Sequence, residues 1–129
     1  MVAQDPRFSE TDRRVLGRFG VEVVERPGAG EFVTASCFLY VPFLAPTVLL
    51  GEVLKGRDPG IYLGLGPGSM RWSVERLDCA DDYAGLVEEF GKGRVVTDLP
   101  GDFEFGGVIF EGLSVCWRLI EDEDGDGEG

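Results

Sequence analysis

Three segments of the chain carry apolar residues at helical spacing, separated by turns rich in glycine and proline. The first follows Ser9, which with Asp12 three residues later predicts an N-terminal cap, and Gly20 ends this helix. The second begins at Pro46, and the third ends at Gly91. The apolar stripes that predict the three helices are Val15, Leu16 and Phe19; Leu49, Leu50, Val53 and Leu54; and Tyr83, Leu86, Val87 and Phe90.

Short runs of β-preferring residues lie between these helices and predict strands. The run 32–41 is apolar on both faces, as in a strand in the middle of a sheet with helices above and below. It is joined through the second helix to another apolar run, so the two should form a parallel βαβ unit. The last run alternates between apolar and polar residues, which predicts an edge strand. The predicted strands cover 21–25, 32–41, 60–66, 94–97 and 113–119, and the opening residues resemble the end of a further strand.

These elements predict one α/β domain over residues 1–120. We expect a small Rossmann-like domain of three layers, with a mostly parallel sheet of four to six strands and the final strand at an edge. Residues 121–129, "EDEDGDGEG", contain no apolar residue and predict a disordered acidic tail.

The composition fits one folded domain and argues against a nucleic-acid partner. The chain has 129 residues, of which 43% are apolar, enough for a core. Its formal charge is −12, and half of that excess comes from the tail. Because acidic residues still outnumber basic ones in residues 1–120 and no run of Lys or Arg is present, a phosphate backbone would be repelled.

The sequence also argues against a disulfide framework, a secretory signal and a membrane span. The three cysteines lie far apart, and the first residues lack a basic and apolar leader, so we expect a cytoplasmic or nuclear protein. Residues 32–51 carry no charge and are long enough to span a bilayer. However, Pro42 and Pro46 interrupt this segment, and Glu31 and Glu52 flank it.

The chain contains no histidine, which excludes serine and cysteine catalysis through an imidazole base and excludes imidazole metal sites. The turn "GLGPGS" follows a predicted strand and could hold a phosphate on its backbone amides, although its spacing also suits a plain turn. We predict no metal or cofactor. The candidate pocket residues, placed at or near strand ends, are Asp5, Pro42, Gly64, Gly66, Gly68, Ser69 and Glu111.

Several segments resemble the SRR1-like domain family, named for "sensitivity to red light reduced". "AQDPRFSETDRRVLGRFGVEVVE" is similar to the family's strand, Gln-Asp-Pro turn and helix, and "TASCFLYVPFLAP" to its Pro-His-Cys-Pro-type turn. "IYLGLGPGSM" resembles its Ile-Gly-Asn-Ser turn, and "VIFEGLSVCWRL" its closing strand. This chain departs from the family at polar positions, with Phe43 and Cys116 in place of histidines and with Glu111 and Gly112 in place of an Asn-Asp pair.

The resemblance implies a regulatory role without an established reaction, associated with light and circadian signalling in plants. Family members carry a strand and a helix before the Gln-Asp-Pro turn, so the resemblance also implies an N-terminally short domain with an exposed apolar strand face or edge. Such a domain should be unstable as a monomer, form a dimer, or be covered by its N-terminal residues and a partner. We therefore expect an intracellular regulatory or interaction protein more than an enzyme. The alternative is an enzyme domain that binds a nucleotide or a phosphometabolite at the strand ends.

Overall fold

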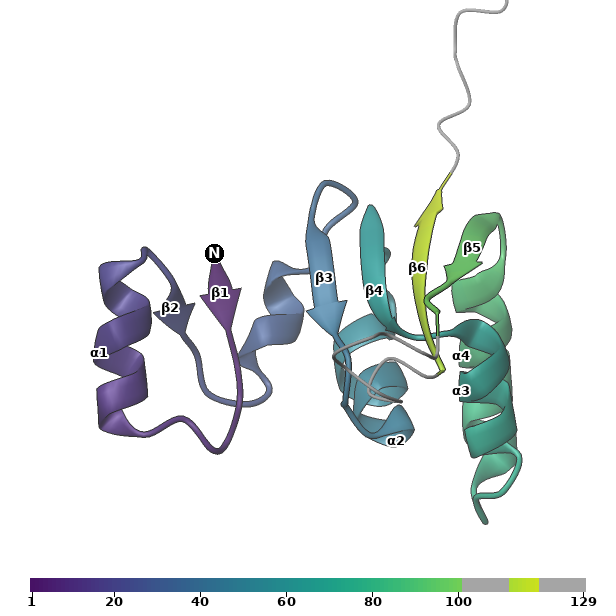
Figure 1. Cartoon of the computed structure of the whole chain (residues 1–129). Helices are drawn as coiled ribbons and strands as arrows, with labels where there is room; N and C mark the ends of the chain where they lie inside the picture. Colours follow the sequence, from purple (N-terminus) through teal and green to yellow (C-terminus); the bar gives the residue numbers. More distant parts are fainter. Residues whose placement is uncertain (101–111, 119–129) are drawn as a thin grey trace, which may run out of the picture.

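The computed structural model describes residues 1–100 and 112–118. Within them the chain forms two sheets that lie side by side (Figure 1). The predicted acidic tail and the candidate residue Glu111 lie outside the described residues.

The N-terminal region is a small βαβ unit. Strand β1 (Val2–Ala3) pairs in parallel with β2 (Glu22–Val23), and α1 (Glu10–Arg18) connects them. The predicted cap is confirmed, because the Ser9 hydroxyl accepts from the Asp12 N–H while the Asp12 carboxylate accepts from the Ser9 N–H. Gly20 ends the turn after α1 with a φ of 77°, where glycine is favoured.

The second region is a four-stranded sheet of order β3-β4-β6-β5. A 3-10 helix, η1 (Gly28–Phe32), leads into it from β2. Its strands are β3 (Phe38–Val41), β4 (Ile61–Leu65), β5 (Arg94–Asp98) and β6 (Leu113–Arg118). The helical elements between them are α2 (Pro46–Val48), which continues as the π-helical η2 (Leu49–Leu54), then α3 (Pro67–Val74) and α4 (Ala80–Gly91).

The expected mostly parallel, Rossmann-like sheet is wrong. The parallel β3-β4 pair is confirmed, but β6 lies antiparallel between β4 and β5, so the four-stranded sheet is mixed and mostly antiparallel. β6 is thus an interior strand rather than the expected edge strand. Its polar residues misled the prediction because Ser114 and Cys116 are buried, and the Ser114 hydroxyl donates to Asp98 at 2.6 Å.

The expected position of the first long strand is also wrong. β3 begins only at Phe38, because η1 and a turn closed by the Cys37 N–H on the Thr34 carbonyl take up the residues before it. β3 lies at one end of the four-stranded sheet instead of in its middle. Although β3 carries apolar residues on both faces, it is not buried on both faces: Phe38 and Tyr40 are exposed.

The helices of the second region pack on one face of its sheet, around Tyr62 and Cys116. The Tyr62 ring meets the edge of Phe90 with centroids 4.8 Å apart, and its hydroxyl donates to the Leu65 carbonyl at 2.8 Å. The predicted stripes of the second and third helices supply most of the other core residues: Leu49, Leu50, Val53, Leu54, Val87 and Phe90. The opposite face carries Phe38, Tyr40 and Ile61, which stay exposed, so the described part has two layers here instead of the expected three.

Among the described residues, no helix is both long enough and apolar enough to cross a membrane. The uncharged segment 32–51 instead forms the end of η1, strand β3, a turn, and the first part of the α2–η2 helix.

Candidate functional site

Two of the predicted pocket segments meet at one end of the four-stranded sheet. Val41 lies opposite Gly64 in the register of β3 and β4, so Pro42 and the turn 64–69 follow neighbouring strands at the same end. Asp5 follows β1 in the other sheet. Its carboxylate accepts from the Arg7 N–H at 2.8 Å and stabilises the turn.

The glycine turn packs closely against the strands beside it. A Cβ at Gly64 would lie 2.7 Å from both the Tyr62 Oη and the Val41 carbonyl. The Gly66 N–H donates to the Gly112 carbonyl at 3.0 Å, and a Cβ at Gly66 would overlap the Ser114 side chain. Close packing therefore explains these two glycines without a ligand.

The outer part of the same turn is open. Gly68 has nothing within 4 Å of where a Cβ would lie, and Ser69 is half-buried near Gly112. Pro67 removes one donor at the start of α3. Phosphate binding at this turn stays a prediction.

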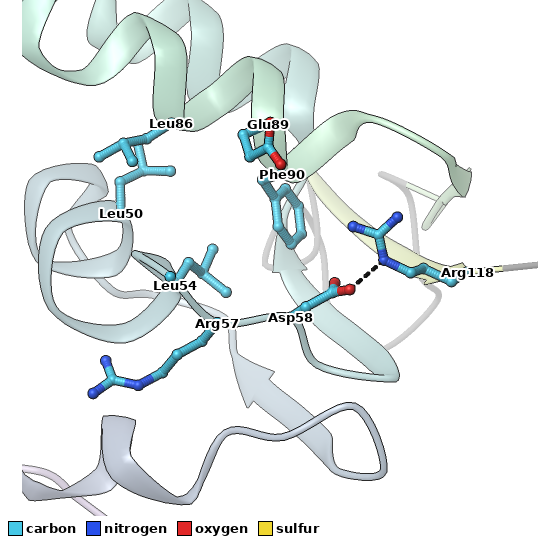
Figure 2. A pocket seen from close by; sticks show the side chains of 9 residues that line it. Leu50, Leu54, Arg57, Asp58, Leu86, Glu89, Phe90 and Arg118 are labelled. Carbon is cyan, nitrogen blue, oxygen red and sulfur yellow. Dashed lines mark hydrogen bonds and ion pairs between the residues drawn. The ribbon is translucent and has the colours of Figure 1, made fainter.

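A cavity of about 330 Å³ lies at the opposite end of the sheet (Figure 2). An ion pair between Asp58 and Arg118 lies on one side of the cavity. Asp58 comes just before β4, and Arg118 is the last residue of the antiparallel β6. Glu89 and Arg57 also line the cavity. Its apolar wall is formed by Leu50, Leu54, Leu86 and Phe90.

The ion pair continues into the protein interior. The Arg94 side chain is fully buried, bonds to the same Asp58 carboxylate, and donates to the Pro59 carbonyl at 3.0 Å. Its guanidinium lies 4.6 Å from the centre of the Phe90 ring. Burial lowers the pKa of Arg94, and the negative charge of Asp58 opposes this shift.

Two arginines thus share one carboxylate, and Arg94 Nε and Nη1 have no hydrogen-bond partner among the described residues. Arginines keep their protons at neutral pH, so this group can hold an anionic or polar group but does not transfer protons. The sequence reasoning did not identify Asp58, Arg94 or Arg118. They meet only because β6 inserts between β4 and β5, which the local pattern does not indicate.

The other buried polar side chains are poorly suited to catalysis. Burial raises the pKa of the Cys116 thiol to about 11 and also raises that of the Tyr62 hydroxyl. Both side chains are closed to solvent, so neither is available as a nucleophile or a base. Among residues 1–100 and 112–118, no group of three or more Cys, Asp or Glu side chains could hold a metal ion.

A family model described as the SRR1 domain matches residues 1–90. The chain belongs to the SRR1 domain family. No curated protein and no solved structure matches the chain. The resemblance inferred from the sequence motifs is thus confirmed at the level of the family.

The SRR1 match extends from β1 to the last turn of α4. It includes all the predicted pocket residues except Glu111, and most of the residues lining the cavity. Arg94 and Arg118 lie beyond it. The buried ion-pair group is therefore made partly from SRR1-matched residues and partly from the two strands that follow them.

Proposed function

We propose that this SRR1 domain is a regulatory interaction module without catalytic activity, and that the open face of its four-stranded sheet contacts a protein partner. The observation that supports the proposal is the exposure of Phe38, Tyr40 and Ile61 by 60%, 55% and 45% on that face. We call these three residues the open-face patch. The domain would act in the cytoplasm or the nucleus, where its cysteines, free in the structure, stay reduced.

The open-face patch has the character of a contact surface. Phe38 lies directly opposite Ile61 in the register of β3 and β4, and Tyr40 follows on the same face. Apolar side chains gathered in this way on a soluble domain mark interaction surfaces, and aromatic residues are enriched at interface centres. The three side chains carry no charge in a chain whose net charge is −12, which favours an apolar partner surface.

The available chemistry supports binding over catalysis. The chain has no histidine, and the pKa values of Tyr62 and Cys116 are raised. The Asp58 carboxylate is bound to two arginines. These features leave no obvious nucleophile with a base beside it among the described residues.

A photo-crosslinking amino acid placed at Ile61, in cells that express the protein, tests this proposal. We expect a discrete covalent adduct at this position. The matched control is the same amino acid at Trp72, which is 59% exposed but lies on α3, on the helical side of the sheet. Equal crosslinking at the two positions, or none at Ile61, would contradict the proposal.

The alternative is a nucleotide- or phosphometabolite-binding domain with its site at the strand ends near Pro42 and Gly64–Ser69. It has less support, because the tight contacts at Gly64 and Gly66 are explained by packing. A thermal-shift series with nucleotides and sugar phosphates distinguishes the two functions. A ligand at about 100 times its Kd would add about 2.7 kcal/mol and raise the Tm by roughly 10 °C or more. We expect no such rise, and a saturable one would favour the alternative.

A further inference from the structure

We propose that the facing edges of β1 and β3 bind one extended segment of another polypeptide, which pairs in parallel with both strands and joins the two sheets. This inference rests on the proposed interaction role and specifies the form of the partner. Among residues 1–100 and 112–118, no strand pairs with β1 or β3 on these edges. In Figure 1 the two arrows point the same way, with η1 between them.

The first edge belongs to β1. Its carbonyls at Met1 and Ala3 accept from the Glu22 and Val24 N–H groups, both at 2.9 Å. Backbone groups alternate in direction along a strand, so the N–H and the carbonyl of Val2 point away from β2. No other group in the described part of the chain bonds to them, so they can pair with an added strand.

The second edge belongs to β3. The Cys37 carbonyl accepts from the Ile61 N–H at 3.2 Å, so Cys37, Leu39 and Val41 direct their backbone groups toward β4. By the same alternation, the N–H and carbonyl groups of Phe38 and Tyr40 point outward. Exposed edge groups of this kind are the usual template for strand addition.

The helix η1 relates the two edges to each other. It packs against β1 on one side and against η2 on the other, and only residues 33–37 separate it from β3. The Ala29 N–H donates to the Gln4 side chain at 2.9 Å, and Gly30 is buried against Glu52 and Arg57. η1 is therefore anchored to both regions, which keeps the two edges near each other.

The chemistry of the edges specifies the segment. β1 and β3 contain no charged residue and no proline, whereas the other end strand of the four-stranded sheet, β5, begins with Arg94 and ends with Asp98. Charged edge residues discourage strand addition, and β3 lacks them. The partner segment should thus be uncharged, rich in β-branched residues and about as long as β3.

The described strands of a second copy of the chain, within residues 1–100 and 112–118, do not fit this description. A segment that lies between β1 and β3 needs both of its own edges free. Every strand in the described part of the chain is already paired on at least one edge. The geometry therefore points to a segment that is unpaired before it binds.

The test uses the full chain and an uncharged hexapeptide with a fluorescein label, acetyl-Ser-Ile-Val-Val-Thr-Ser-amide, with fluorescence anisotropy as the readout. We expect saturable binding to the wild type and, within about twofold, to Tyr40→Val, which keeps the backbone N–H. Tyr40→Pro removes that N–H at an edge position where proline is tolerated, and should weaken binding at least about tenfold. The same peptide with proline at its second valine should not bind.

Amide exchange measured by NMR shows where the peptide lies. In the free chain the Val2, Phe38 and Tyr40 amides should exchange rapidly, and the peptide should slow all three. A spin label at the peptide's N-terminus should broaden Val2 and Phe38 more than Val41, because the added strand runs parallel. If Tyr40→Pro has lost the slow exchange of the β4 amides, Phe38→Pro replaces it, because proline is tolerated at the first residue of a strand.

Three results would overturn the strand-binding proposal: protection of the Phe38 and Tyr40 amides in the free chain, no peptide binding, or equal binding to wild type and Tyr40→Pro. The proposed function fails separately, through the crosslinking at Ile61. Ile61 lies on β4, which has β3 and β6 on its two sides and presents no free edge.

Discussion

The two regions of the molecule differ in how they are held together. The N-terminal unit has two-residue strands, and its helix α1 has no buried residue. Phe19, which directly follows α1, is 79% exposed. The second region buries Tyr62, Leu49 and Leu50 completely. Local hydrogen bonds and turn geometry therefore define the first region, whereas a packed core defines the second.

Polar contacts join the two regions within the described part of the chain. Arg26, just after β2, forms an ion pair with Glu52 on η2, with one hydrogen bond of 2.8 Å. This pairing lowers the pKa of Glu52. Exposed ion pairs contribute little to stability, so we infer that the N-terminal unit can open without the four-stranded sheet.

The largest expected difference between the regions is in how much the free energy of unfolding falls when an aromatic residue in each region is replaced by alanine. Tyr62→Ala removes a fully buried ring that packs on Phe90, and should lower the free energy of unfolding by about 4 kcal/mol. The matched change Phe19→Ala in the N-terminal unit should cost less than about 0.5 kcal/mol. Because both tryptophans, Trp72 and Trp117, lie in the second region, urea-dependent NMR amide exchange of α1 and of β4 measures the two values separately. Similar costs at the two positions would show that the N-terminal unit has a core of its own.

A second pair of variants examines the glycine turn of the second region. A methyl group at Gly64 meets the Val41 carbonyl, which belongs to the neighbouring strand and cannot move freely, so Gly64→Ala should cost about 2 kcal/mol. Gly68→Ala meets no atom and should be neutral or stabilise α3 by about 0.5 kcal/mol. Thermal unfolding of the two variants gives the comparison. A neutral Gly64→Ala would mean that packing does not explain this glycine, and would favour the ligand-binding alternative.

The same contrast explains which features the sequence could predict. The cap at Ser9, the helix start at Pro46 and the stripe ending at Phe90 depend on residues within one helix, and all three were predicted correctly. Strand order depends on partners distant in sequence. The position of β6 could not be predicted, because Ser114 resembles a solvent-facing residue until its bond to Asp98 is known.

The candidate sites follow the same rule. Pro42 and the turn 64–69 lie at the same end of the sheet because β3 and β4 pair in parallel, which the βαβ pattern predicted. Asp5, expected near them, follows a strand of the other sheet, and a ligand pocket at these residues stays a prediction. The group formed by Asp58, Arg94 and Arg118 was missed, because it depends on the unpredicted antiparallel strand. Neither arginine belongs to a motif that would indicate a site.

The smallest expected effect concerns the cap of α1 and its dependence on pH. The backbone N–H of Ser9 and, to a smaller extent, its hydroxyl lower the pKa of Asp12. A carboxyl group whose pKa is lowered by folding stabilises the folded state above its ordinary pKa, and this stabilisation is lost as the pH falls through the lowered value. Acidification should therefore fray α1 while the amides of β4 and β6 stay protected, as NMR amide exchange would show.

Replacing the cap residue separates the two contributions. Ser9→Ala should reduce the stability of α1 by about 1 kcal/mol, because the capping hydroxyl is lost. The pKa of Asp12 should rise only part of the way to its ordinary value, because the N–H of residue 9 still donates to the Asp12 carboxylate. An NMR titration of the Asp12 carboxyl carbon measures this shift. Exchange at β4 should not change in this variant, since α1 buries no residue against the second region. If β4 exchange accelerates together with α1, the two regions unfold as one unit, and the polar contacts at Arg26 and η1 couple them more strongly than their exposure indicates.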